Sequence, residues 1–302
     1  YYEQYLRGQN GERKFYIDTV GRISEIISNT DSVAGDDLYL SIDADLQKAT
    51  YIALEREIAG IVYSNIKAGN IPIIDVYKAL IGNRVIDISH FTEDDASATE
   101  KGLYSSFKNT HKNVQKNIKK ELTTSPKALD QMSDETLDEF THIISMLKDN
   151  GILLTSEIDT NDETYQKWKN QKISPKEYLN YCISQQWIDI SQLSVDEKYA
   201  DSSEVYDALC NYILDHLKDD KDFDTIIYEY MIARGDISPR KLCIILFEQG
   251  VLDYDDATVN KLKNGTLAPY DFIMDKINRV EITPAQLALE PCTGSTIVTD
   301  VK

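Results

Sequence analysis

Aspartates alternate with other residues from Asp220 to Asp224, which is the spacing at the start of a calcium-binding loop. Carboxylate oxygens are the ligands that Ca²⁺ takes in such a loop. However, Thr225 occupies the place of the required glycine, and Met231 occupies the place of the carboxylate that closes the site. The segment is more typical of a solvated helix start, where acidic groups meet the positive end of the helix dipole. We therefore predict no metal site and no bound cofactor.

Cysteine and histidine could supply nucleophilic, acid–base or zinc chemistry, but neither type clusters in this sequence. The cysteines stand far apart without a C-x-x-C pair, so a zinc site is not expected and no disulfide can be argued. Cys182, Cys210 and Cys243 fall within apolar helical patterns and are predicted to pack as small core residues, unlike Cys292. The histidines are solitary and are interpreted as surface or satisfied residues: His90, His111, His142 and His216.

Composition restricts the classes of partner. The chain has 302 residues and a formal charge of -19, which would repel phosphate backbones and an anionic bilayer, so nucleic acid is not expected as a partner. It contains neither a long apolar run nor a charged-then-apolar leader, so no membrane span or signal peptide is predicted. Tyr1 is not an initiator methionine, and we therefore expect a trimmed piece of a longer protein.

Strands are predicted only near the two ends of the chain. Residues 14–18 and 23–27 flank a turn in which Gly21 can supply positive φ, so they are predicted to form a short hairpin. Residues 38–42 alternate apolar and other residues as a half-buried strand does, and residues 295–301 are typical of a buried strand.

Helices dominate the rest of the sequence. Asp43 is predicted to cap a helix over 45–67, because apolar residues recur there with a period close to 3.6. Gly69 is placed to end that helix. The same periodicity predicts ten further helices, at 74–81, 97–121, 133–148, 161–170, 175–186, 202–218, 222–233, 239–248, 255–263 and 269–278.

A short signature recurs at three helix starts, in which Ser or Thr stands at the N-cap and Pro at the first helical position. It comprises Ser174-Pro175, Ser238-Pro239 and Thr283-Pro284. The first two copies extend into similar segments 64 residues apart, which indicates either a duplicated helix-turn-helix unit or shared capping chemistry. An all-helical stretch between strand-bearing ends is typical of an inserted domain, so we expect the two ends to meet in space.

The end segments carry a set of short motifs. Residues 1–11 form a Glu- and Tyr-rich segment followed by L-x-G-x-x-G, whose glycines are Gly8 and Gly11. Asp18-x-x-Gly21-Arg22 comes next, and residues 38–47 end in S-I-D-x-x-L-Q, with Asp43, Leu46 and Gln47. The final residues 294–302 read G-S-T-I-V-T-D-V-K, with Gly294 and Asp300. Together these segments resemble the class B penicillin-binding proteins, membrane-anchored transpeptidases that cross-link peptidoglycan.

The resemblance covers residues 1–67 and 285–302, under a third of the chain. It implies that the ends belong to the family's pedestal and to the start of its transpeptidase domain, with the motif residues in structural roles. In the family, a serine in S-x-x-K is acylated with the help of S-x-N and K-[ST]-G motifs. Three S-x-x-K strings begin at Ser64, Ser105 and Ser238, but no K-[ST]-G follows them, and the resemblance places the nucleophile beyond Lys302.

The predicted fold is α+β and mostly α: a small β-rich pedestal made from residues 1–68 plus 283–302, and an acidic all-helical inserted domain over 69–282. The hypothesis is a non-catalytic fragment of a penicillin-binding protein, with the insertion as a spacer or docking module for other cell-wall synthesis or division proteins. The parent would bind peptidoglycan stem peptides and β-lactams at the extracytoplasmic face of the bacterial membrane, anchored by an N-terminal helix. The alternative is a free-standing α-helical interaction or adhesion domain without enzymatic activity. A hydrolase that uses a pair of carboxylates has little support, because no two acidic residues stand at a spacing that distinguishes them from the many others.

Overall fold

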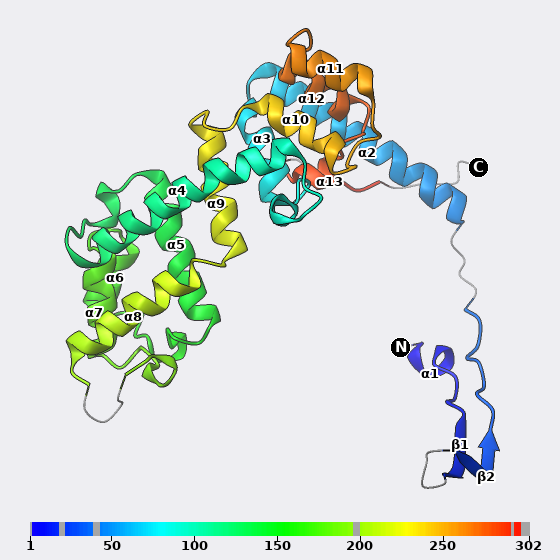
Figure 1. The fold of residues 1–302 in the computed structure, drawn as a ribbon, viewed down its shortest axis with the longest axis horizontal. Helices are drawn as coiled ribbons and strands as arrows, with labels where there is room; N and C mark the ends of the chain where they lie inside the picture. Colours follow the sequence, from blue (N-terminus) through cyan, green and yellow to red (C-terminus); the bar gives the residue numbers. More distant parts are fainter. Residues whose placement is uncertain (1, 18–21, 39–42, 196–199, 291–292, 297–302) are drawn as a thin grey trace. The chain divides into compact units, whose positions relative to one another are not determined.

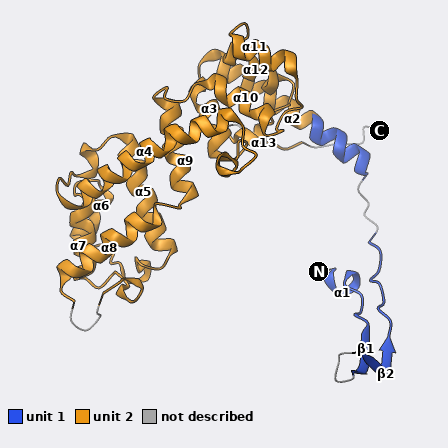
Figure 2. Ribbon diagram, viewed as in Figure 1, with its two compact units in different colours: residues 1–52 blue, residues 53–302 orange. Residues whose placement is uncertain are grey.

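The computed structural model describes residues 2–17, 22–38, 43–195, 200–290 and 293–296. Within these ranges the chain forms thirteen α-helices and one two-stranded antiparallel sheet near the N-terminus (Figure 1). It divides into two compact units, residues 1–52 and 53–302 (Figure 2). The prediction of a mostly helical chain with a small sheet is confirmed. The predicted division into a pedestal and an insertion at residues 68/69 and 282/283 stays a prediction.

The first unit is built around a β-hairpin. A one-turn helix, α1 (Glu3–Leu6), precedes β1 (Glu12–Ile17) and β2 (Ile23–Thr30). The strands pair antiparallel, from Glu12 opposite Thr30 to Ile17 opposite Ile23, with two irregularities in the register. The predicted hairpin is therefore confirmed in its described residues, while residues 18–21 at its turn lie outside them. The predicted strands at 38–42 and 295–301 also fall largely outside the described residues.

Apolar side chains of this hairpin are exposed on both of its faces. Phe15 and Tyr16 are neighbours in β1, so they point to opposite faces, and they are 42% and 61% exposed. No described residue of the first unit is buried. A lone two-stranded hairpin is marginally stable in water, so this unit contains too little packing to hold itself together.

The second unit is helical, and its α-helices up to residue 278 match the predicted ones with ends shifted by two residues or fewer. The last helix, at residues 284–287, was predicted only through its Thr-Pro start. A long helix, α2, crosses the boundary between the units. Short 3-10 helices, absent from the sequence prediction, join several α-helices: η1 (Ile88–Thr92), η2 (Leu129–Gln131), η3 (Thr155–Glu157) and η4 (Ile190–Gln192). The helices are α2 (Ala44–Ala68), α3 (Ile73–Gly82), α4 (Ala98–Thr123), α5 (Asp134–Asp149), α6 (Glu163–Lys169), α7 (Pro175–Ser184), α8 (Ser202–His216), α9 (Lys221–Ala233), α10 (Pro239–Glu248), α11 (Asp256–Asn264), α12 (Pro269–Asn278) and α13 (Pro284–Leu287).

Side-chain caps fix several helix starts. Ser174 and Glu177 form a reciprocal capping box at α7, and Thr283 and Gln286 form one at α13, as the Ser/Thr-Pro signature predicts. Ser238 occupies the N-cap of α10, but its side chain makes no capping hydrogen bond. The signature therefore located all three helix starts correctly and overstated the bonding at one of them.

One turn type ends many of these helices. The residue after the C-cap takes a positive φ, and the residue two places further on is a buried aliphatic side chain. The turn occurs at Gln186 and Gly250, the two positions that the predicted 64-residue offset relates, with φ of 61° and 68°. It also occurs at Arg84, Gly151 and Val280. The shared feature is thus a helix-ending turn that extends beyond the two predicted copies.

The core of the second unit is continuous from Ile58 in α2 to Leu287 in α13. The chain after α13 returns to the start of this unit, since a methyl group on Gly294 would lie 3.1 Å from Cδ1 of Leu54 and 3.3 Å from Cδ1 of Ile58. The buried free cysteines Cys182, Cys210 and Cys243 lie in this core, which confirms their predicted role. No described helix is both long enough and apolar enough to cross a membrane.

Candidate functional site

The S-x-x-K strings lie on helix surfaces. Ser64 and Lys67 are exposed on α2, and the Ser64 hydroxyl donates to the carbonyl of Gly60 at 2.8 Å. Ser105 is exposed on α4, where Lys108 places its ammonium over the ring of Tyr104. A serine nucleophile needs a base within hydrogen-bond reach, and among the described residues no hydrogen bond joins either serine to its lysine.

The third string fits acyl transfer no better. Ser238 is the exposed N-cap of α10, and Lys241 is exposed on the first turn of that helix. The backbone N–H of Lys241 donates to the carbonyl of Ser238 at 2.9 Å, which is an ordinary bond of a helix start. None of the three strings therefore carries the geometry of an activated serine.

The calcium-like segment is the N-terminus of α9, and its carboxylates diverge. Asp220 caps the helix, with Oδ1 accepting from the N–H groups of Asp222 and Phe223. Asp222 forms an ion pair with Arg84 at 2.8 Å, and Asp224 points into the protein. Because each carboxylate has its own direction, they do not converge on one cation.

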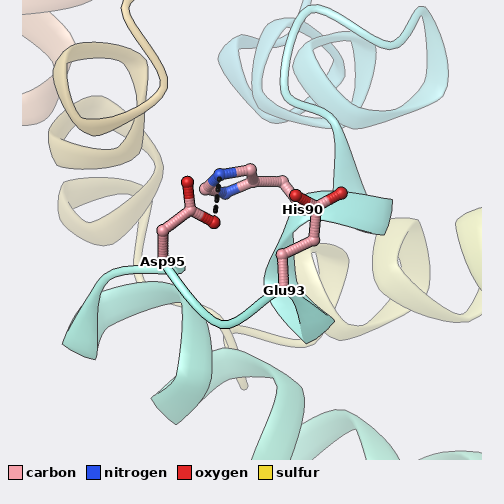
Figure 3. Close-up of side chains that lie close together, drawn as sticks. All are labelled: His90, Glu93 and Asp95. Carbon is pink, nitrogen blue, oxygen red and sulfur yellow. Dashed lines mark ion pairs between the residues drawn. The ribbon is translucent and has the colours of Figure 1, made fainter.

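A second cluster has the residue types of a metal site. His90, Glu93 and Asp95 offer ligand atoms that lie within 4.8 Å of one another, on η1 and the segment before α4 (Figure 3). His90 Nε2 lies 3.6 Å from Asp95 Oδ1, while both acidic residues are exposed. Exposed acidic groups of this kind are common without a metal, so their proximity alone does not indicate a metal site. The hydrogen bonds of His90 indicate a structural role instead.

Those bonds run inward to Glu100, which is fully buried. His90 Nδ1 lies 2.8 Å from Glu100 Oε1, and the side-chain amide of Gln249, at the C-cap of α10, donates to the same oxygen at 2.7 Å. The second oxygen, Oε2, accepts from the backbone N–H of Ser97 in a capping box at the start of α4. The buried carboxylate is therefore hydrogen-bonded on both oxygens, and it joins η1, α4 and the end of α10.

These hydrogen bonds shift the pKa values of Glu100 and His90 in opposite directions. Burial raises the pKa of Glu100, but the hydrogen bonds from Gln249, Ser97 and His90 outweigh burial and hold the pKa below its usual value. The bond to Glu100 raises the pKa of His90 above its usual value. His90 thus directs Nδ1 to the buried Glu100 and Nε2 to the exposed Asp95. These hydrogen bonds hold η1, the start of α4 and the end of α10 together, which is a structural role.

Two other histidines hold the loop between α8 and α9. His142 in α5 and His111 in α4 contact the ring of Phe223, the first stacked and the second edge-on. His142 Nε2 lies 2.7 Å from Asp220 Oδ2, and His111 Nε2 lies 3.0 Å from the carbonyl of Leu217. The hydrogen bond that His142 donates to Asp220 raises the pKa of His142 above its usual value. All four histidines thus have partners within the fold, because even the exposed His216 places Nδ1 2.9 Å from the carbonyl of Tyr212, one turn earlier in α8. This agrees with their interpretation as surface or satisfied residues.

The motif glycines of the first unit lie where two backbone segments approach each other. The N–H groups of Gln9 and Val33 donate to each other's carbonyls at 2.8 and 2.9 Å. A methyl group on Gly11 would lie 2.7 Å from the Thr30 carbonyl oxygen, and Gly8, with φ of 66°, faces the Val33 carbonyl. Only glycine fits such contacts without moving the backbone.

The remaining motif residues flank α2 or lie outside the description. Asp43 Oδ1 accepts from the backbone N–H groups of Asp45 and Leu46 at 3.0 Å, which confirms its predicted role as a helix cap. Leu46, Gln47 and Arg22 are exposed. Asp18, Gly21 and Asp300 are not among the described residues, and their roles stay predictions.

Comparison with known proteins gives one similarity. Part of the chain is similar to a cell-wall transpeptidase. The relative is the peptidoglycan D,D-transpeptidase FtsI, found in two strains of Escherichia coli, with 39% identity over 75 residues. The aligned segment is 25% of this chain but 12% of the relative, so the chain spans only a small part of the length of that protein. No protein-family model and no solved structure matches the chain.

Sequence reasoning missed the buried carboxylates. Glu100 belongs to a Ser-x-x-Glu capping box at residues 97–100, a signal present in the sequence. Glu139 stands in the apolar stripe of α5 together with Phe140, Ile143 and Leu147, and an acidic residue at a core position of a helix is a recognisable anomaly.

Proposed function

We propose that this chain is a non-catalytic part of a peptidoglycan D,D-transpeptidase of the penicillin-binding type, located outside the cytoplasmic membrane. The observation that carries the proposal is the 39% identity to FtsI over 75 residues. The parent protein would bind peptidoglycan stem peptides and β-lactams, and an N-terminal helix would anchor it. The exposed S-x-x-K strings agree with a nucleophile supplied by another part of that protein.

The apolar hairpin supports this assignment. Exposed apolar side chains on both faces of a two-stranded sheet need a partner in water. Further strands and helices of the parent's pedestal, to which the N-terminal motifs are similar, would supply that cover. The first unit is accordingly proposed to be one piece of a larger pedestal.

The helical unit is proposed to act as a spacer or docking module for other proteins of wall synthesis or division. Its support is its size and its place between the two motif-bearing ends of the chain. Its continuous core, from Ile58 to Leu287, gives it the packing to present a fixed surface to a partner protein.

Labelling of the full-length parent with a fluorescent penicillin tests the catalytic part of the proposal. The chain of residues 1–302 alone should take up no label, while the parent should be labelled. Ser64→Ala, Ser105→Ala and Ser238→Ala should each leave the labelling of the parent unchanged. Loss of labelling in any of these folded variants would place the nucleophile inside this chain and disprove the proposal.

Removal of residues 69–282 from the parent tests the role of the helical unit. We expect β-lactam labelling to be retained and co-purification of wall-synthesis partners to be weakened. Loss of labelling with the pedestal and catalytic fold intact would instead show that the helical unit takes part in assembling the active site.

A free-standing helical interaction or adhesion domain is the second candidate. The observation in its favour is that every buried apolar residue of the described chain lies in the second unit. It predicts that residues 53–302 fold alone and bind their partner without residues 1–52. A parent gene that lacks S-x-x-K, S-x-N and K-[ST]-G motifs after residue 302 would favour it over the first proposal.

A further inference from the structure

Glu139 occupies a costly position. It lies in the buried face of α5, between α4 and α9, and only 3% of its surface is exposed. The described residues offer its carboxyl group no hydrogen bond, in contrast to the fully bonded Glu100. A buried carboxyl without a partner costs free energy, so a glutamine or leucine would be the cheaper residue here if packing were the sole requirement.

The carboxyl group lines a cavity of about 370 Å³. Eight of the nine residues that line the cavity are polar, and Val114 is the exception. Asn113 and Asn117 lie one turn apart on α4, and neither side-chain amide has a hydrogen bond among the described residues. Ser133 and Thr136 add hydroxyl groups from the first turn of α5. The cavity therefore combines a buried acid that has no hydrogen-bond partner among the described residues with two exposed amides that no other described side chain engages.

The charges around Glu139 favour a positively charged occupant. Glu135 and Asp138 on α5 add negative charge near it, and Arg234 at the end of α9 is the cation that faces it. The Arg234 guanidinium is already committed to Glu135 and to Asp236. The α4 wall contributes only Thr110, Asn113, Val114 and Asn117, none of which ionises. An ionised Glu139 thus leaves the cavity with unbalanced negative charge.

We propose that this cavity binds a primary ammonium group, carried by an amino sugar or by a lysine-type side chain, with Glu139 as its counter-ion and the Asn113 and Asn117 amides as hydrogen-bond partners. An ammonium group donates three hydrogen bonds, which the carboxylate and the two amide oxygens can accept. Burial raises the pKa of Glu139 to about 8, so at pH 7 the carboxyl releases a proton when the cation binds. This proposal is independent of the parent's transpeptidase activity.

Calorimetric titration of the 302-residue chain at pH 7 tests the proposal with two pairs of probes. Glucosamine is compared with N-acetylglucosamine, and N-α-acetyl-lysine with N-α,N-ε-diacetyl-lysine, so that each pair differs in the charged amine. We expect saturable binding of at least one amine, at least tenfold weaker binding of its acetylated partner, and proton release seen as a dependence of the heat on buffer ionisation. Binding of glucosamine alone indicates a glycan ligand, and binding of N-α-acetyl-lysine alone indicates a peptide side chain.

Two variants separate a binding site from a structural residue. Glu139→Gln keeps the shape of the side chain and should weaken amine binding at least tenfold while remaining folded. Glu163→Gln removes an exposed carboxylate on α6 and should leave binding unchanged. The proposal is overturned if neither amine binds, if the acetylated probes bind equally well, or if Glu139→Gln binds like the unaltered chain.

Discussion

His142 and Asp220 are joined by a hydrogen bond of 2.7 Å that ties the middle of α5 to the N-cap of α9. The two oxygens of Asp220 have separate tasks, because Oδ1 caps α9 and Oδ2 accepts from the imidazole. Both groups are half-buried, so water screens the pair only in part. A single aspartate thus fixes a helix start and its packing partner together.

Asp220→Ala should therefore destabilise the chain by about 2 to 3 kcal/mol, since a lost cap costs about 1 kcal/mol and a lost charged hydrogen bond adds to it. Asp201→Ala is the matched control, because Asp201 caps α8 at an exposed site and makes no hydrogen bond to a histidine. Urea unfolding measures both. Equal losses in the two variants would show that the contact with His142 contributes nothing.

Stability should fall as pH rises from about 6 to 8.5. Burial raises the pKa of Glu139 to about 8 in the folded chain, from 4.5 when unfolded, so the folded state holds a proton that the unfolded state has lost. The stability that this proton contributes is fully present at and below pH 4.5 and is lost as the pH rises past 8. His142, with its raised pKa, acts in the same direction above its unfolded value. We expect a loss of about 2 to 4 kcal/mol over this range.

Glu139→Gln removes most of that pH dependence, because the amide does not ionise. Urea unfolding at pH 6.0, 7.0 and 8.5 gives the comparison, with Glu163→Gln as the exposed control. If the free energy of unfolding of Glu139→Gln fell with pH as steeply as that of the unaltered chain, other groups would be its cause. Asp224, whose pKa burial raises to about 6, contributes mainly below this range.

Two helical glycines should respond to alanine with opposite signs. Gly102 in α4 has open space around it, so Gly102→Ala should stabilise the chain by about 1 kcal/mol through helix propensity. At Gly82 in α3, a methyl group would meet the carboxylate of Glu229 in α9, which lies 3.9 Å from Lys78. Gly82→Ala should therefore bring no gain or a loss. Thermal unfolding compares the two variants, and an equal gain at both sites would contradict close packing of α3 on α9.

Val280 occupies a strained backbone position. It takes a φ of 58° after α12, where a β-branched side chain is unfavourable. Val280→Gly should therefore stabilise the chain by about 1 kcal/mol, whereas Gly265→Ala, at a φ of 83° after α11, should destabilise it by a similar amount. Chemical unfolding of both variants checks the signs. Destabilisation by Val280→Gly would show that the packing of the half-buried valine outweighs its strain.

The three core cysteines should be unreactive in the folded chain. Burial raises the pKa of Cys182 and of Cys243 to about 12 and also raises that of Cys210, so the thiolate is scarce at pH 8. In a Cys292→Ser background, a thiol reagent should label none of them until denaturant is added. Rapid labelling of one thiol under native conditions would locate a region that opens easily.

The local elements of this protein could be predicted from the sequence. The apolar period of 3.6 defined the helices because a helix must bury one face, and Pro at the first helical position marked the starts at 175 and 284. The turn with Gly21 between residues 14–18 and 23–27 indicated the hairpin. These are short-range properties, and each depends on neighbours along the chain.

Tertiary structure alone decided which polar groups became buried. Glu100 and Glu139 are both glutamates of amphipathic helices, yet Glu100 meets Gln249 from α10, 149 residues away, while Glu139 faces a cavity between α4 and α5. The pairing of His142 with Asp220 likewise joins residues 78 positions apart. Burial and hydrogen bonding set the charge of these groups, and both depend on which helix faces meet, a relationship that the local periodicity of a sequence does not contain.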